Sequence, residues 1–252
     1  DSKTFDNGTI CASEQSIIVE RCMEAKVVEE LKSQGAFVLT QEQSRQLGKF
    51  ILRANGTMNP MIVGKTCAQI AEYAGLCGVP SSARVLVGRE TKVGADAPYS
   101  REKLAPILGL FVEENTDRVL ERSIEILHME GAGHTFSMHA EDEGRVRKFA
   151  LQIPASRFLV NTPGALGGIG ATTGLFPALT LGCGAVGGSS SSNNIGPLDL
   201  INIKRVAFGT KELEEIRRES ETVQNGTSAS GSGQISHELI NAIVDKIVKE
   251  FI

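Results

Sequence analysis

Cys11 is the residue of this chain whose type and surroundings best suit covalent chemistry. It lies in SKTFDNGTICASEQ (residues 2–15), on a glycine-containing turn just before a β-branched run. A thiol on such a turn is open to a substrate, and neighbouring backbone N–H groups can lower its pKa and stabilise an oxyanion. A free cysteine is also commonly a small buried apolar side chain, so the local pattern alone leaves both interpretations open.

Two histidines in GHTFSMHA (residues 133–140) are further candidates, because this segment has the composition of a strand. Side chains alternate along a strand, which puts His134 and Met138 on one face and His139 on the other. The two histidines therefore cannot form a metal-binding pair on one strand. Either could orient a substrate, with His134 better placed because it follows Gly131 and Gly133, and a structural role remains the alternative for each. No grouping has zinc-ligand spacing, so we predict no metal.

Composition excludes several classes of protein. The chain has 252 residues, a net charge of −4 and no basic cluster, which argues against nucleic-acid binding. No window approaches the apolar length of a membrane-spanning helix. Five scattered cysteines without a C-x-x-C pair are typical of free thiols in a reducing cytoplasm.

Short β-branched runs alternate with longer helical patterns, which predicts an α/β fold with a mostly parallel sheet flanked by helices. Capping boxes at Thr40 with Gln43 and at Thr66 with Gln69 mark two helix starts, and Gly35 ends an earlier helix. Functional loops are expected at the strand ends. We expect strands over residues 16–19, 37–39, 84–87, 107–112 and 158–161, and helices over residues 22–33, 40–53 and 117–129, with another beginning at Thr66.

Residues 161–197 change to a Gly-, Ser-, Thr- and Asn-rich composition, and we expect a long functional loop there. Within it GCGAVG (residues 182–187) matches the spacing of a dinucleotide-binding fingerprint. We reject that interpretation, because the following serine-rich run is a poor helix former. The alternation in Ile201 to Phe208 predicts an exposed edge strand, whose unpaired backbone groups need a partner, and KELEEIRRES is expected to follow as a charged helix.

The C-terminal part has two further segments. Residues 220–235 are poor in apolar residues and rich in Gly and Ser, which predicts a flexible linker. Residues 236–252 carry eight apolar side chains on one helical stripe. A helix of this length is too short to span a membrane. The stripe needs a partner, because each large apolar side chain left in water forgoes about 1.5 to 3 kcal/mol.

Five ordered segments besides the Cys11 turn resemble the CoA-acylating aldehyde dehydrogenases, the branch that includes microcompartment propionaldehyde and acetaldehyde dehydrogenases. They are GKTCAQIAEYAGL, REKLAPILGLF, GHTFSMHA, RFLVNTPGALGGIG and TLGCGAVGGSSSSNNIGPLDLINIKRVA. The resemblance extends over nearly all of residues 1–219, which it identifies as a catalytic domain with a C-terminal oligomerisation strand. The family's dinucleotide-binding domain precedes this region, so the chain, which begins at Asp1, is expected to be a catalytic-domain fragment.

The resemblance implies that Cys11 is the nucleophile, that NAD is the cofactor and that coenzyme A is the co-substrate. A short aldehyde becomes an acyl thioester on Cys11, and coenzyme A then displaces the thioester. Glu102 would bind the nicotinamide ribose, since a carboxylate accepts hydrogen bonds from two hydroxyls; by itself it also fits a solvated helix start. Expected near the substrate or coenzyme A are His134, Asn161, Thr162, Pro163 and Gly164.

Residues 236–252 resemble the encapsulation peptides that carry enzymes into bacterial microcompartments. The resemblance implies docking to a shell or cargo protein and a place inside a microcompartment of the bacterial cytoplasm. The resemblance of residues 1–219 to the enzyme family implies a homo-oligomer when the protein is full length. A hydrolytic aldehyde dehydrogenase and a non-catalytic assembly module remain the alternative functions. The helix could also fold back onto the catalytic domain.

Overall fold

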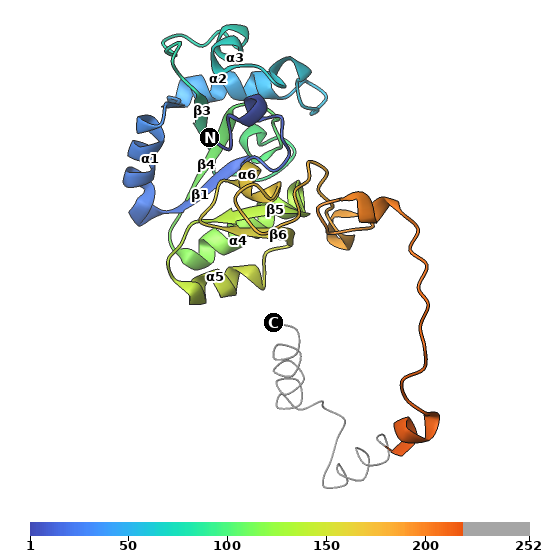
Figure 1. Cartoon of the computed structure of the whole chain (residues 1–252). Coiled ribbons are helices and arrows are strands. Elements are labelled where there is room, and N and C mark those ends of the chain that lie inside the picture. The colour runs from blue at the N-terminus through green and yellow to red at the C-terminus, as the bar shows by residue number, and fades with distance from the viewer. Residues whose placement is uncertain (219–252) are drawn as a thin grey trace. The chain divides into compact units, whose positions relative to one another are not determined.

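A computed structural model of the protein describes residues 1–218 (Figure 1). The chain divides into a unit of residues 1–201 and a unit of residues 202–252, and the second is described as far as residue 218. The predicted linker over residues 220–235 and the predicted helix over residues 236–252 lie outside the described residues. The candidate site belongs entirely to the first unit.

Four strands form one parallel sheet in the order β1-β4-β3-β2. They are β1 (Ser16–Glu20), β2 (Ala36–Val38), β3 (Val85–Arg89) and β4 (Ile107–Glu113). Leu86, Val87 and Ile107 on the two central strands have no exposed surface, as expected where a parallel sheet is covered on both faces. The four strands predicted in this part of the sequence are confirmed.

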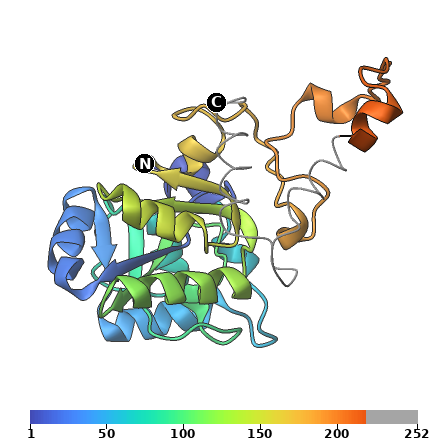
Figure 2. The same ribbon diagram turned by 90° about the horizontal axis from the view of Figure 1, so that it is seen from below.

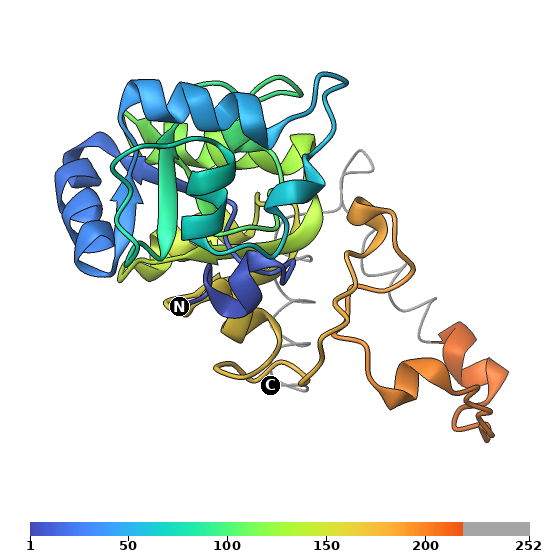
Figure 3. The ribbon, with the colours of Figure 1, turned by 90° about the horizontal axis from the view of Figure 1, so that it is seen from above.

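Helices α1 (Glu24–Ser33), α2 (Gln41–Ile51) and α3 (Cys67–Tyr73) connect the first three strands. Both predicted capping boxes are present: the backbone N–H of Gln43 donates to Thr40 Oγ1 at 3.2 Å, and that of Gln69 donates to Thr66 Oγ1 at 3.3 Å. The α2 and α3 helices are neighbours in Figures 1 and 3 and share a buried core with β3 and β4. Gly35 after α1 has the predicted left-handed conformation, with φ at 90°.

A second, two-stranded parallel sheet consists of β5 (Gly133–Met138) and β6 (Ala155–Val160). Helices α4 (Thr116–Met129), α5 (Glu143–Ala150) and α6 (Gly164–Gly168) belong to this part of the chain. Figures 1 and 2 show α4 and α5 as neighbours, and their apolar faces share a core with β5. Phe136 and Phe158 are paired across the sheet with ring centroids 5.3 Å apart. The predicted α/β architecture is confirmed.

Two predictions from the sequence differ from the structure. Residues 161–197 are not one long loop, because α6 lies within them, together with a 3₁₀ turn over Ala185–Gly187. Residues 201–208 form no strand within the described chain; they are exposed and without a ladder partner. An alternating pattern becomes a strand only where another strand accepts its hydrogen bonds. Residues 213–218 are helical, in agreement with the charged helix predicted there.

Short 3₁₀ turns complete the described elements. Besides Ala185–Gly187, they comprise Phe5–Gly8, Arg21–Met23, Pro60–Ile62, Pro98–Ser100 and Pro197–Leu200. In residues 1–218, no helix has the length and the apolar character that crossing a lipid bilayer requires.

Candidate active site

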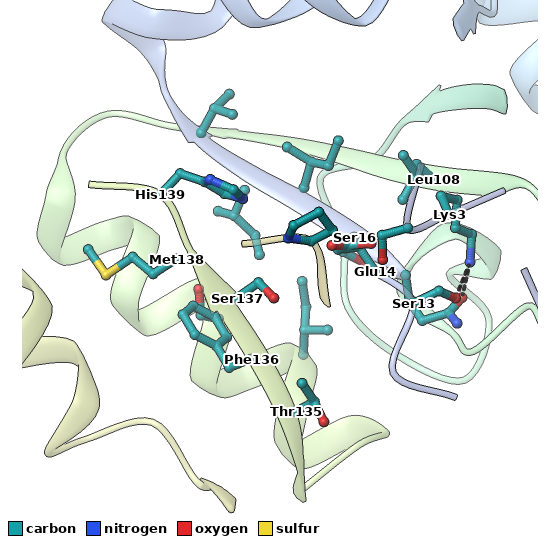
Figure 4. Close-up of a pocket in the computed structure, with 18 of the residues that line it drawn as sticks. Lys3, Ser13, Glu14, Ser16, Leu108, Thr135, Phe136, Ser137, Met138 and His139 are labelled. Atoms are coloured by element: carbon teal, nitrogen blue, oxygen red, sulfur yellow. Dashed lines mark hydrogen bonds between the residues drawn. The ribbon is translucent and has the colours of Figure 1, made fainter. Parts of the chain in front are cut away.

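A cleft of about 1480 Å³ opens between β1, at the edge of the first sheet, and β5 in the second. Figure 4 shows Ser13, Glu14 and Ser16 on one wall and β5 on the other, with Ser137 and His139 turned toward the β1 side. Phe136 and Met138 lie on the opposite face of β5 from Ser137 and His139, as strand alternation requires, and pack with α4 and α5. Polar side chains therefore line the cleft on both sides, from the segment that leads into β1 and from β5.

Cys11 lines this cleft and is exposed, on a turn that leads into β1. The turn requires a glycine at position 8, where φ is 78° and a Cβ atom would lie 2.7 Å from the backbone of Ala105. Partial burial raises the pKa of the Cys11 thiol, and the negative charge of Glu102 adds to this effect. Backbone N–H groups at Cys11 and Ala12 lower that pKa as expected, but the net shift is upward, contrary to the sequence-based expectation.

Glu102 lines the same cleft, so the structure brings together the two residues to which the resemblance gives the most definite roles. Burial and the nearby Glu130 carboxylate raise the pKa of Glu102, whereas Lys3 and Lys103 lower it. The backbone N–H of Glu102 donates to Glu130 Oε2 at 2.6 Å, which fixes the position of its main chain. No residue in the described range 1–218 forms a hydrogen bond or an ion pair with the Glu102 carboxylate, so it is available to a ligand hydroxyl.

Two buried lysines lie beside these carboxylates, and sequence reasoning did not identify them. Lys3 is 4% exposed and donates to Gln15 Oε1 at 3.2 Å, and burial lowers its pKa to about 7. Lys103 has no exposed surface, and its ammonium donates to the carbonyl oxygen of Tyr99 at 2.9 Å. Burial and the charge of Lys3 place the pKa of Lys103 well below its usual range. For Lys103, the only signal in the sequence was its position at the start of an apolar run.

His134 also lines the cleft, at the beginning of β5. Its Nδ1 lies 2.8 Å from Thr135 Oγ1. Burial lowers the pKa of the imidazole, and the positive charge of Arg157 lowers it further. Both effects favour the neutral imidazole of His134, the state in which a ring nitrogen can accept a proton. His139 lies on the cleft wall as well.

Asn161 and Thr162 form hydrogen bonds within the fold and do not line the cleft. The Asn161 side chain accepts from the N–H of Ala140 at 3.0 Å and donates to the carbonyl oxygen of Ala140 at 2.9 Å. Thr162 is buried, and its hydroxyl lies 2.5 Å from that of Thr172. A direct contact between either side chain and a substrate stays a prediction.

Pro163 lines the cleft, and Gly164 lies next to it. The N–H of Gly164 donates to Glu14 Oε1 at 2.7 Å. A Cβ atom at this glycine would come within 2.8 Å of the Ala12 carbonyl oxygen and 2.9 Å of Glu14 Oε1. The α6 helix therefore starts in close contact with the residue that follows Cys11.

The glycine-rich segment around Cys183 packs against the start of β5. A Cβ atom at Gly133 would lie 2.0 Å from the carbonyl oxygen of Cys183, so only glycine permits this approach. The segment continues as a 3₁₀ turn over Ala185–Gly187. A dinucleotide fingerprint requires a helix at this point, so its rejection from the sequence is confirmed. Cys183 lines the cleft that contains Cys11.

Comparisons with known proteins agree with this arrangement. No family model matches the chain. Aldehyde-alcohol dehydrogenase 2 of Entamoeba histolytica is 37% identical over 225 residues, which cover 86% of this chain and 26% of that protein. An acetylating aldehyde dehydrogenase from Geobacillus thermoglucosidasius superposes with a TM-score of 0.80 at 46% identity, over 84% of this chain and 46% of the other. The homologues of this chain are thus acylating aldehyde dehydrogenases.

A crystal structure of a probable aldehyde dehydrogenase from Listeria monocytogenes is 64% identical. It superposes with a TM-score of 0.81, and the match covers 86% of this chain and 48% of the other. The chain thus spans about a quarter of the aldehyde-alcohol dehydrogenase and about half of the two solved aldehyde dehydrogenases. The described α/β fold accordingly matches one part of each of these enzymes.

Proposed function

We propose that the protein containing this chain oxidises a short aldehyde such as acetaldehyde or propionaldehyde to the corresponding acyl-CoA, with NAD as the oxidant and Cys11 as the nucleophile. The observation that carries the proposal is that Cys11 and Glu102, far apart in the sequence, line one cleft with a neutral His134. Similarity to acylating aldehyde dehydrogenases supports the reaction class. The cleft offers a thiol for covalent catalysis, a carboxylate for cofactor binding and an imidazole for proton transfer.

The covalent steps use sulfur chemistry at Cys11. The thiolate adds to the aldehyde carbonyl carbon, and the backbone N–H groups of Cys11 and Ala12, which favour negative charge on this thiol, can also donate to the resulting oxyanion. Loss of hydride from the adduct leaves a thioester. The thiol of coenzyme A then attacks the thioester carbonyl, forms acyl-CoA and releases the Cys11 thiolate. The neutral imidazole of His134 can accept the proton of the incoming thiol.

Glu102 is the residue of this chain that fits NAD. Its carboxylate lines the cleft with Cys11 and can accept hydrogen bonds from two ribose hydroxyls. NAD, when bound, would accept the hydride that the Cys11 adduct loses. Burial is the main cause of the raised pKa of Glu102, because it removes water that would otherwise solvate the carboxylate. Hydrogen bonds from a bound ribose would replace those lost with that water.

The identity of the acyl acceptor separates this proposal from a hydrolytic aldehyde dehydrogenase. Full-length protein supplied with propionaldehyde and NAD is expected to form propionyl-CoA in an amount equal to the NADH formed, and only when coenzyme A is present. Mass spectrometry of the products measures both compounds. Free propionate as the main product, at a rate independent of coenzyme A, would show the hydrolytic reaction instead. No NADH under either condition would favour the non-catalytic assembly module.

Assembly with other proteins is proposed from the sequence of residues 236–252, which lie outside the described structure. Their apolar stripe favours docking in a groove of a shell or cargo protein of a bacterial microcompartment, with Lys and Glu side chains facing water. We also propose that the exposed residues 201–208 gain a strand partner in a homo-oligomer, because an alternating segment with unpaired backbone groups needs one.

A fusion protein tests the docking of the tail. Residues 234–252 joined to a fluorescent protein are expected to give bright foci in a cell that assembles microcompartments. The double substitution Ile243→Asp/Ile247→Asp places two charges on the apolar stripe and should leave the fluorescence diffuse. Foci that survive these two substitutions, or diffuse fluorescence from both fusions, would contradict the proposal.

A further inference from the structure

Glu130 lies where α4 ends, a place that disfavours a carboxylate. Its backbone N–H donates to the carbonyl oxygen of Ile126 at 3.0 Å, so it occupies the C-terminal end of the helix, where the helix dipole is negative. Its side chain lines the cleft that contains Cys11 and Glu102. The stability of α4 therefore does not explain a glutamate at this position.

Both carboxylate oxygens of Glu130 hold one short segment, residues 101–103, which leads into β4. Oε1 accepts from Arg101 Nε, and Oε2 accepts from the backbone N–H of Glu102 at 2.6 Å. The Arg101 guanidinium also donates to the carbonyl oxygen of Ala95 at 3.0 Å. Because α4 shares a core with β5 and the segment leads into β4, Glu130 joins the two parts of the fold on either side of the cleft.

The two cations next to Glu102 in the sequence have other partners. Arg101 forms an ion pair with Glu130. The Lys103 ammonium donates to the carbonyl oxygen of Tyr99 at 2.9 Å and to that of Arg101. An arginine beside a carboxylate readily forms a two-point ion pair with it, and the contact with Glu130 engages the Arg101 guanidinium elsewhere. The Glu102 carboxylate thus stays unpaired within residues 1–218 although it has a cation on each side in the sequence.

We propose that Glu130 is a positioning residue for cofactor binding: it fixes the main chain of Glu102 and engages Arg101, so that the Glu102 carboxylate lines the cleft unpaired. The inference rests on the proposed function, in which this carboxylate binds the nicotinamide ribose of NAD. Two hydroxyls of one ribose need an acceptor in a fixed place, and a group that is already ordered loses less conformational entropy on binding. Glu130 acts only through Glu102.

The charge of Glu130 acts on Glu102 in the opposite direction from its hydrogen bonds. Burial is the main cause of the raised pKa of Glu102, and the negative charge of Glu130 adds to it. If charge were its whole effect, Glu130→Gln would favour the ionised Glu102 and tighten NAD binding. A glutamine has one acceptor oxygen, so it cannot hold both Arg101 and the N–H of Glu102 in the same way. Loss of positioning is therefore expected to weaken NAD binding.

Titration calorimetry of NAD binding to the full-length protein, without aldehyde or coenzyme A, tests the proposal without turnover. Glu130→Gln is expected to raise the Kd of NAD about tenfold, the scale of coupling within one hydrogen-bond network. Glu102→Gln tests the proposed function and is expected to raise this Kd as well. Added to Glu102→Gln, the Glu130→Gln change is expected to alter the Kd by less than about twofold, because the carboxylate that Glu130 positions is already absent.

Glu113→Gln is the matched control. The Glu113 side chain is 12% exposed and paired with Arg122, and it lies outside the cleft. This variant should leave the Kd of NAD unchanged, because it breaks a comparable ion pair that does not hold Glu102. A purely structural role for Glu130 would instead raise the Kd by the same factor with and without the Glu102 carboxylate.

Two results would overturn the inference and leave the proposed function intact: an unchanged or lower Kd in Glu130→Gln, or an equal rise in both Glu102 backgrounds. If Glu130→Gln fails to fold, Glu130→Asp decides, because it keeps the charge but is one methylene shorter; an unchanged Kd in that variant contradicts positioning. An unchanged Kd in Glu102→Gln would reject the NAD role proposed for Glu102, and the inference with it.

Discussion

Replacing Cys11 with serine is expected to lower acyl-CoA formation by the full-length protein by at least about 10³-fold, a scale typical for the loss of a nucleophile. Cys11 is exposed in the cleft, where backbone N–H groups favour its thiolate although burial raises the pKa of the thiol overall. A serine hydroxyl at the same place has a far higher pKa and would remain protonated. The measurement is the initial rate of NADH formation with propionaldehyde, NAD and coenzyme A.

Cys77→Ser is the matched control, because Cys77 is exposed but lies outside the cleft. Its rate should stay within about twofold of the unmodified protein, as surface substitutions generally have small effects. Cys67 is an unsuitable control, since it is buried and its pKa is raised to about 12 by that burial. A Cys11→Ser protein that retains a tenth or more of the activity would rule out Cys11 as the nucleophile.

Lys3 is expected to make the stability of the fold depend on pH in the neutral to alkaline range. Burial lowers its pKa to about 7 in the folded protein, from 10.5. Between these two values the unfolded chain binds more protons than the folded one, so stability rises with pH. Well below pH 7, Lys3 is protonated in both the folded and the unfolded chain, so its contribution to the free energy of unfolding no longer changes with pH. The gain from Lys3 between pH 7 and pH 9 is on the order of 2 kcal/mol.

Lys3→Met tests this dependence with a side chain of similar length and no charge. Urea unfolding at pH 7 and at pH 9 gives the free energy of unfolding of each protein. The unmodified protein should gain about 2 kcal/mol more than Lys3→Met between these two values of pH. Lys65→Met is the control, since Lys65 is a partly exposed lysine outside the cleft, and it should keep the rise. Equal pH dependence in Lys3→Met and the unmodified protein would show that Lys3 titrates normally.

Local patterns allowed much of the first sheet and its helices to be predicted. A Thr followed three residues later by a Gln predicted each capping box, and the hydrogen bonds of both boxes are present. The buried strands are short apolar runs between helices, which the sequence shows without tertiary information. The segment over residues 201–208 was predicted incorrectly as a strand for the described chain, because pairing depends on a partner that periodicity does not supply.

The candidate site was predicted in part. Cys11, Glu102 and His134 came from local pattern and resemblance, and the structure places all three on one cleft. The burial of Lys3 and Arg157 was not predicted, because a lysine or an arginine is normally exposed and no spacing rule indicates burial. Each is buried by segments distant in the sequence, so its environment exists only once the chain has folded.

The most direct test of the central claim is to observe the acyl group on Cys11. Full-length protein is mixed with propionaldehyde and NAD without coenzyme A, quenched in acid and digested, and the peptide containing Cys11 is analysed by mass spectrometry. The account predicts one propionyl group on Cys11, and its complete loss, with formation of propionyl-CoA, when coenzyme A is added before quenching. Acylation of another residue, or NADH formation with Cys11 unmodified throughout, would contradict it.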